Sequence, residues 1–173
     1  MDLPRRKNIR LSDYNYAQAG AYFITICTKN KCSLLWDFPV GATSEYPTLS
    51  RYGQIVDNAI NNIHKIYTSV EIDKYVIMPN HVHMIIRLSD NDGRAMPAPT
   101  EKQSIRDKRL PPFPGIGNII QQTKGYTSKQ IGFPIWQKGF YDHIIRNEQD
   151  YLTRWKYIDE NPLKWQDDEL FQE

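Results

Sequence analysis

The amino-acid sequence predicts an α+β fold, namely a ferredoxin-like split βαβ sandwich with an antiparallel sheet and one extra C-terminal helix. Two observations predict this fold. Runs rich in aromatic and β-branched residues alternate with runs whose apolar residues recur at helical spacing, in the order β-α-β-β-α-β-α. The second and third strand-like runs are separated only by Pro79 and Asn80, a pair typical of a turn, which favours an antiparallel hairpin.

The individual elements have recognisable boundaries. Ser50 can cap the first helix and Asn147 the last one. The last helix should stop near Asn161, because Pro162 disfavours the α conformation in the residue before it. The expected elements are a strand at 20–28, a helix within 49–69, strands at 70–78 and 81–88, a helix at 116–130, a strand within 135–146 and a helix at 148–161.

Length and composition limit the domain organisation. A chain of 173 residues with 40% apolar residues predicts a single domain over residues 1–173. The segment 89–115 contains five prolines, many charges and no periodicity, so we expect a mobile loop there. No window approaches twenty apolar residues and the N-terminus lacks the apolar run of a secretory signal, which predicts a cytoplasmic protein without a membrane segment.

Charge is unevenly distributed, although the net charge is only +2. Residues 102–156 are basic, and residues 157–173 are acidic. A basic region of this density fits a phosphate-binding face and an ordinary solvated surface about equally well.

Two histidines stand one residue apart in the strand 81–88. Side chains alternate across a strand, so His81, His83 and Arg87 share one face, and the apolar residues between them share the face that the first two helices should cover. We therefore expect the histidines on an open, polar face, within reach of one metal ion or one phosphate. An isolated His-x-His pair on a surface also occurs without any function.

The last helix carries a second group of polar residues. At about 100° per residue, its apolar stripe consists of Tyr151, Leu152, Trp155 and Ile158. Tyr157 falls outside this stripe and shares the other side of the helix with Arg154 and Asn161. That side combines a potential nucleophile, a cation for phosphate and an oxygen that can bind a metal.

Three segments, "MPNHVHMII", "IWQKGFYDHIIRNEQDY" and "KYIDENPLK", resemble the single-tyrosine HUH transposases of prokaryotic insertion sequences, and most of all their REP-associated tyrosine transposase branch. The resemblance extends from "AYFITICT" to "NPLKW". It implies a ferredoxin-like core, a divalent metal held by His81, His83 and Asn161, and Tyr157 as the nucleophile. The metal implied is Mg²⁺ or Mn²⁺, whereas imidazole ligands alone would also suit Zn²⁺.

The resemblance also implies a reaction and a substrate. Tyr157 would attack a phosphodiester of single-stranded or hairpin DNA, giving a 5′-phosphotyrosine and a free 3′-OH that can attack in return. The nearby metal, or a positive side chain such as Arg154 or Lys156, would help the phenol to ionise. The candidate DNA-binding residues are Arg87, Lys124, Arg154 and Lys156. The assembly is left open between a homodimer and a monomer.

Two other functions fit parts of this pattern. A metal-dependent nuclease that uses water would need the histidines and Asn161 but not Tyr157. A non-catalytic nucleic-acid-binding module would stack bases on aromatic residues of its sheet, whereas this sheet face carries two histidines. A covalent link between protein and DNA distinguishes the transposase from both alternatives.

Overall fold

The computed structural model describes residues 18–37, 48–89 and 115–171. Its main sheet contains four antiparallel strands in the order β4-β5-β1-β6. These strands are β1 (Gly20–Cys27), β4 (Val70–Ile77), β5 (His81–Leu88) and β6 (Tyr141–Ile145). The order and direction of the strands confirm the predicted split βαβ sandwich. Apart from its two end residues, the expected loop at 89–115 lies outside the described residues.

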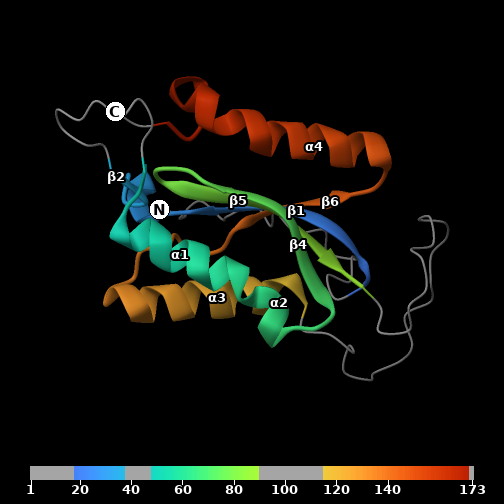
Figure 1. The fold of residues 1–173 in the computed structure, drawn as a ribbon, viewed down its shortest axis with the longest axis horizontal. Helices are drawn as coiled ribbons and strands as arrows, with labels where there is room; N and C mark the ends of the chain where they lie inside the picture. Colours follow the sequence, from blue (N-terminus) through green and yellow to red (C-terminus); the bar gives the residue numbers. More distant parts are fainter. Residues whose placement is uncertain (1–17, 38–47, 90–114, 172–173) are drawn as a thin grey trace, which may run out of the picture.

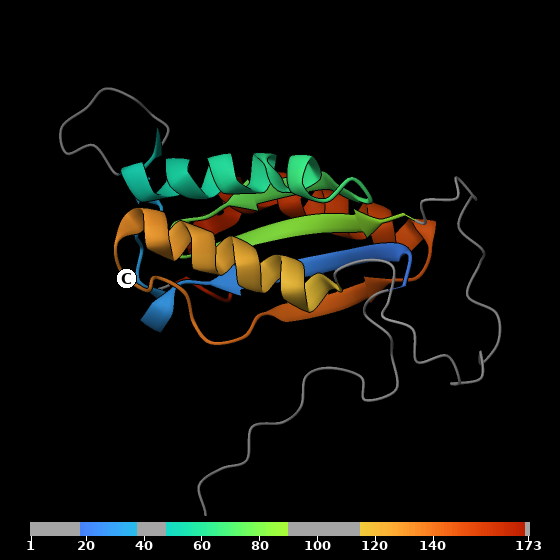
Figure 2. The same ribbon diagram turned by 90° about the horizontal axis from the view of Figure 1, so that it is seen from below.

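Helices cover both faces of this sheet (Figure 1). On one face, α1 (Arg51–Asn61) lies beside α3 (Ile116–Ile131), and the short α2 (Ile63–Ile66) follows α1 (Figure 2). On the other face, α4 (Glu148–Glu160) crosses the sheet and continues into a 3₁₀ helix, η2 (Asn161–Asp167). None of the described helices is long and apolar enough to span a bilayer.

Several local predictions are confirmed. The Ser50 hydroxyl accepts a hydrogen bond from the Gly53 amide, and the Asn147 side chain accepts one from the Asp150 amide, so both expected caps form. The helix α4 ends at Glu160, next to Asn161, as predicted, but the predicted reason is wrong: Asn161 keeps an α conformation (φ −57°, ψ −43°) before Pro162, and the chain continues as η2. Four small elements of the described residues were not predicted: the 3₁₀ helices η1 (Lys29–Lys31) and η2, and the strands β2 (Trp36–Asp37) and β3 (Thr48–Leu49), which pair with each other.

The second face of the sheet differs from the prediction of an open, polar surface. Beneath α4 lies a small apolar cluster consisting of Ala21, Phe23, Ile85, Ile145 and Ile158, with Val76, Tyr151 and Trp155 packed against it. Because α4 and η2 cover this face, His81 and His83 are 0% and 3% exposed. Leu152, expected in the apolar stripe of α4, is 52% exposed instead.

The start of α1 packs closely against the chain that precedes it. A Cβ atom at Gly53 would lie 2.2 Å from the carbonyl oxygen of Leu35, a backbone atom that cannot move aside freely. We therefore expect Gly53→Ala to lower the free energy of unfolding by about 1–3 kcal/mol or more, measured by denaturant titration. Gly125→Ala in α3 is the control, because nothing lies within 4 Å of its Cβ position. That variant should be stabilised by roughly 0.4–1 kcal/mol, and equal effects of the two substitutions would contradict the close approach at Gly53.

Candidate active site

The two histidines of β5 are held by hydrogen bonds from neighbouring segments. His83 Nδ1 lies 2.8 Å from the Thr25 hydroxyl on β1, and His81 Nδ1 lies 2.8 Å from Asn80 Oδ1. The two imidazole rings are 4.4 Å apart between centroids. The pair is thus fixed at its Nδ1 atoms, which leaves both Nε2 atoms to face the remainder of the site.

Asn80 determines which nitrogen of His81 carries the proton. Its Nδ2 donates to the carbonyl oxygens of Lys31, at 3.1 Å, and Leu170, at 2.8 Å. The Asn80 Oδ1 atom must therefore be the acceptor for His81 Nδ1–H. His81 Nε2 consequently presents a lone pair, and this buried atom has no hydrogen-bond partner among the described residues.

Burial keeps both imidazoles neutral. Removal from water lowers the pKa of His81 to about 4 and that of His83 to about 2, since the charged form loses its hydration. The positive charge on Lys31 also disfavours protonation of His81, and the Asp168 carboxylate partly offsets these effects. Neutral imidazole is the form that binds a metal ion.

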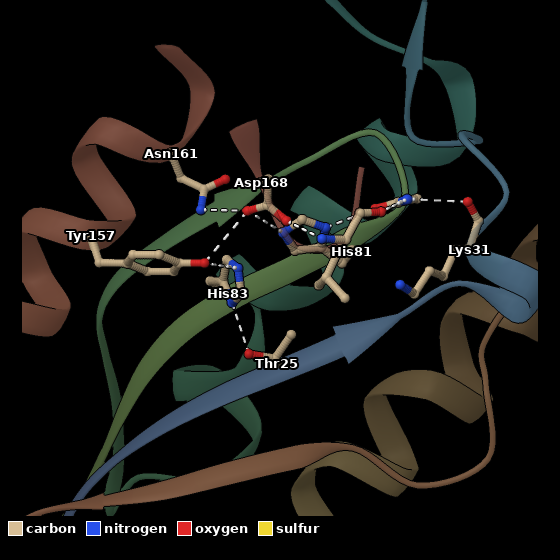
Figure 3. A network of polar contacts seen from close by, with 9 residues as sticks. Thr25, Lys31, His81, His83, Tyr157, Asn161 and Asp168 are labelled. Atoms are coloured by element: carbon tan, nitrogen blue, oxygen red, sulfur yellow. Dashed lines mark hydrogen bonds and ion pairs between the residues drawn. The ribbon is translucent and has the colours of Figure 1, made fainter. Parts of the chain in front are cut away.

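Two oxygen-bearing side chains reach the histidines from the end of α4 and the segment after it (Figure 3). Asn161, 4% exposed, donates from Nδ2 to Asp168 Oδ2 at 3.0 Å, while its own buried Oδ1 has no partner among the described residues. The side chain of Asp168 is 3% exposed, and its Oδ2 lies 4.0 Å from His81 Nε2. Ligand atoms of His81, His83 and Asp168 lie within 4.8 Å of one another.

These residues fit a divalent metal ion. Two buried atoms, His81 Nε2 and Asn161 Oδ1, are acceptors without partners, and a carboxylate lies beside them. Buried polar atoms in proteins are ordinarily paired, so such atoms indicate a missing partner. Imidazole nitrogen combined with carboxylate and amide oxygen suits Mn²⁺, and also Zn²⁺.

Asp168 is a site residue that the sequence did not predict. This aspartate lies in the acidic C-terminal segment, where a run of charges is typical of a solvated surface. It reaches the site because the chain turns through η2 after Pro162, and neither helical nor strand periodicity marks such a turn. The sequence pattern likewise predicts only a strand at Thr25 and a turn at Asn80, and not their contacts with the histidines.

Tyr157 projects from α4 toward His83. Its hydroxyl lies 3.5 Å from His83 Nε2 and 3.5 Å from Asp168 Oδ2, and its ring packs edge-on against those of His83 and Phe23. The residue is 41% exposed, so solvent reaches the side chain. Burial raises the pKa of Tyr157, and the negative charge of Asp168 raises it further, so the phenol is protonated at neutral pH.

The cations expected near Tyr157 are engaged with carboxylates. The Arg154 guanidinium pairs with Asp150 at 3.4 Å and lies over the ring of Phe23, while Lys156 pairs with Glu160 at 3.5 Å. The expectation that one of them helps the phenol to ionise stays a prediction.

Arg87 and Lys124 lie away from the histidines. Arg87, near the end of β5, pairs with Asp73 at 2.7 Å and with Glu71 at 2.9 Å. Lys124, on α3 at the opposite face of the sheet, donates to the carbonyl oxygens of Gln137 and Gly139. The structure thus brings together His81, His83, Tyr157 and Asn161 of the predicted site residues, with Arg154 at its edge.

The neutral buried histidines should make stability depend on pH in the metal-free protein. In the unfolded chain they protonate near pH 6.5, whereas in the folded protein they stay neutral until about pH 4 or below. The native state therefore binds fewer protons in this window, and the free energy of unfolding should fall as the pH drops below about 6.5. Denaturant titration in EDTA should show a loss on the order of 3 kcal/mol between pH 7 and pH 5.

His64 provides the control for this pH dependence, because its side chain is exposed on α2. His64→Gln should show the same loss of stability as the unchanged protein. A free energy of unfolding that is equal at pH 7 and pH 5 would contradict the buried, neutral state of the histidine pair.

Comparison with known proteins relates the chain to a group of relatives. No protein-family model matches it. A Haemophilus influenzae protein described only as uncharacterized is 36% identical over 172 residues, covering 96% of this chain and 93% of its own length. A putative REP-associated tyrosine transposase of the same organism is 26% identical over 157 residues, and the REP-associated tyrosine transposase of Escherichia coli is 28% identical over 156 residues. Each of these two covers 89% of this chain, which spans 77% and 74% of their respective lengths.

A solved structure has the same fold. The structure of a REP-associated tyrosine transposase bound to a REP hairpin matches with a TM-score of 0.60 at 23% identity, over 90% of this chain and 74% of that chain. At 23% identity, this match shows that the two chains share a fold.

Proposed function

This chain belongs to the REP-associated tyrosine transposase family, and from that premise we propose that it cleaves and rejoins single-stranded DNA through a covalent bond to Tyr157. The observation that carries the proposal is the 3.5 Å distance between the Tyr157 hydroxyl and Nε2 of His83. The nucleophile and the cluster of potential metal ligands therefore meet within one chain.

His81, His83 and Asp168, with the Oδ1 atom of Asn161, would hold Mg²⁺ or Mn²⁺. When bound, such an ion supplies positive charge that polarises the oxygens of the scissile phosphate. The chain itself prepares this binding: Thr25 and Asn80 orient the imidazoles, and burial keeps both of them unprotonated.

The covalent step is an in-line displacement at phosphorus. A bond forms between Tyr157 Oη and phosphorus, and the bond between phosphorus and the 3′ oxygen of the preceding nucleotide breaks. The Tyr157 proton passes to water, which reaches this 41% exposed side chain, and the departing 3′ oxygen takes a proton from water. Attack of a 3′-OH on the phosphotyrosine reverses these changes and joins the strands.

The substrate is single-stranded DNA next to a hairpin. A relative has been solved bound to a REP hairpin, which supports a hairpin as the recognised element. Tyr157 lies on a helix packed against the sheet, and none of the helices in the described residues projects from the fold as a recognition helix for a DNA groove does.

A labelled hairpin oligonucleotide with single-stranded flanks, incubated with the protein and Mn²⁺, tests the proposal. On a denaturing gel, the label should migrate with the protein when it is on the 3′ side of the cleavage site. Labelled fragments released without attached protein would instead indicate a nuclease that uses water. Equal cleavage of a fully paired duplex would refute the preference for single strands.

A further inference from the structure

The loop after β1 holds an uncommon backbone conformation next to the histidine pair. Asn30 and Lys31 have φ values of 56° and 54°, and they are the two non-glycine residues with positive φ in the described part of the chain. This left-handed region is unfavourable for residues with a side chain, although asparagine tolerates it better than lysine. Such strain persists where surrounding contacts fix the backbone, and it is enriched at functional sites.

Hydrogen bonds fix this loop directly to the site. The Thr28 hydroxyl lies 2.8 Å from the Cys32 carbonyl oxygen, across the loop. The Lys31 carbonyl accepts a hydrogen bond from Asn80 Nδ2, and the other end of the same amide orients His81. The position of Lys31 is therefore coupled to the position of the His81 ring.

The side chain of Lys31 extends toward His81 from the side away from Tyr157 (Figure 3). Two ring contacts agree with this order, since Tyr157 packs on His83 and His83 packs on His81. The charge of Lys31 is also near enough to His81 to lower the pKa of its imidazole. The cation thus lies beyond the histidine pair as seen from the tyrosine.

The Lys31 ammonium has no ion-pair or hydrogen-bond partner among the residues that the structure describes. In this respect it differs from Arg154 and Lys156, whose charges pair with the carboxylates of Asp150 and Glu160. An unpaired cation on a backbone fixed to the site can bind an anion of the substrate without first losing another partner.

We propose that Lys31 binds a phosphate of the DNA strand that ends in the departing 3′ oxygen. This inference rests on the proposed function. In an in-line displacement, the leaving oxygen departs on the side opposite the attacking oxygen. With the scissile phosphate at the histidine pair, Tyr157 lies on one side of phosphorus and Lys31 on the other, so the released strand lies on the side of Lys31.

Three variants separate the charge of Lys31 from its backbone. Lys31→Asn removes the ammonium and keeps a residue type that tolerates positive φ, while Lys31→Arg keeps the charge. Lys29→Asn is the matched control, since this exposed lysine lies in the same loop. The cleavage site on the hairpin oligonucleotide is first mapped with the unchanged protein and Mn²⁺.

Binding is then measured in EDTA for two oligonucleotides, namely the half that ends in the 3′-OH and the half that begins with the 5′-phosphate. Lys31→Asn should bind the 3′-OH half about fivefold more weakly. The slope of the logarithm of the binding constant against the logarithm of the salt concentration should fall by about one, which corresponds to the loss of one phosphate contact. Its affinity for the 5′-phosphate half should be unchanged, which also shows that the variant is folded. Lys31→Arg should restore binding, and Lys29→Asn should resemble the unchanged protein.

The outcomes are distinguishable. If the unchanged protein forms no covalent adduct, the proposed function fails and the role of Lys31 fails with it. If the adduct forms but Lys31→Asn binds the 3′-OH half as tightly as the unchanged protein, or Lys31→Arg fails to restore binding, the role of the Lys31 charge is wrong while the proposed function stands.

Discussion

Tyr157→Phe should fold and bind DNA but form no covalent protein–DNA adduct. The rate of adduct formation should fall at least about a thousandfold, because no other group can attack phosphorus from this position. The cost in stability should be at most about 1 kcal/mol, because both contacts of the hydroxyl are long, at 3.5 Å, and the residue is 41% exposed. The adduct is measured on a denaturing gel, and folding by denaturant titration.

Tyr151→Phe is the control on the same helix. The Tyr151 hydroxyl donates to Asp73 Oδ2 at 2.9 Å, and the Tyr151 side chain packs against the apolar cluster under α4, away from the metal-ligand cluster. This variant should lose about 1 kcal/mol of stability and still form the adduct. An adduct that persists in Tyr157→Phe, or a phosphorylated peptide that does not contain Tyr157, would refute the assignment of the nucleophile.

His83→Ala should lose stabilisation by Mn²⁺. In the unchanged protein, Mn²⁺ at about 100 times its dissociation constant should raise the free energy of unfolding by about 2.7 kcal/mol, because only the folded chain holds the ligands together. His83→Ala removes a metal ligand and leaves the Thr25 hydroxyl without its partner at His83 Nδ1. It also exposes the face of Phe23 that stacks on the His83 imidazole in the unchanged protein. The variant should lose both the stabilisation by Mn²⁺ and the formation of the covalent adduct.

The substitution itself should cost roughly 2–4 kcal/mol, so each protein is compared with its own metal-free form. His143→Ala is the control, since its imidazole binds Asp150, 2.7 Å away, and links β6 to α4 outside the ligand cluster. That variant should keep the Mn²⁺ effect. An equal Mn²⁺ effect in His83→Ala would show that the metal binds elsewhere.

Much of the fold follows from local patterns in the chain. Strand alternation assigned His81 and His83 to the same face, and α4 ends at the expected place, where the chain changes from an α to a 3₁₀ helix. The apolar stripe predicted for α4 includes one residue, Leu152, that does not pack on the sheet. Tyr151, Trp155 and Ile158 pack on the sheet at i, i+4 and i+7, whereas Leu152 lies about 100° around the helix and faces solvent.

The sequence by itself determined the order of the elements, the hairpin, the histidine pair and Tyr157, because each depends on residues that are close together in the chain. Only the tertiary structure decided that α4 covers the second face of the sheet and buries the histidines. It also decided that Asp168 and Lys31 reach them, through irregular segments whose sequences carry no periodicity. Alternation along a strand fixes the side to which a residue points, but what covers that side depends on contacts between segments far apart in the sequence.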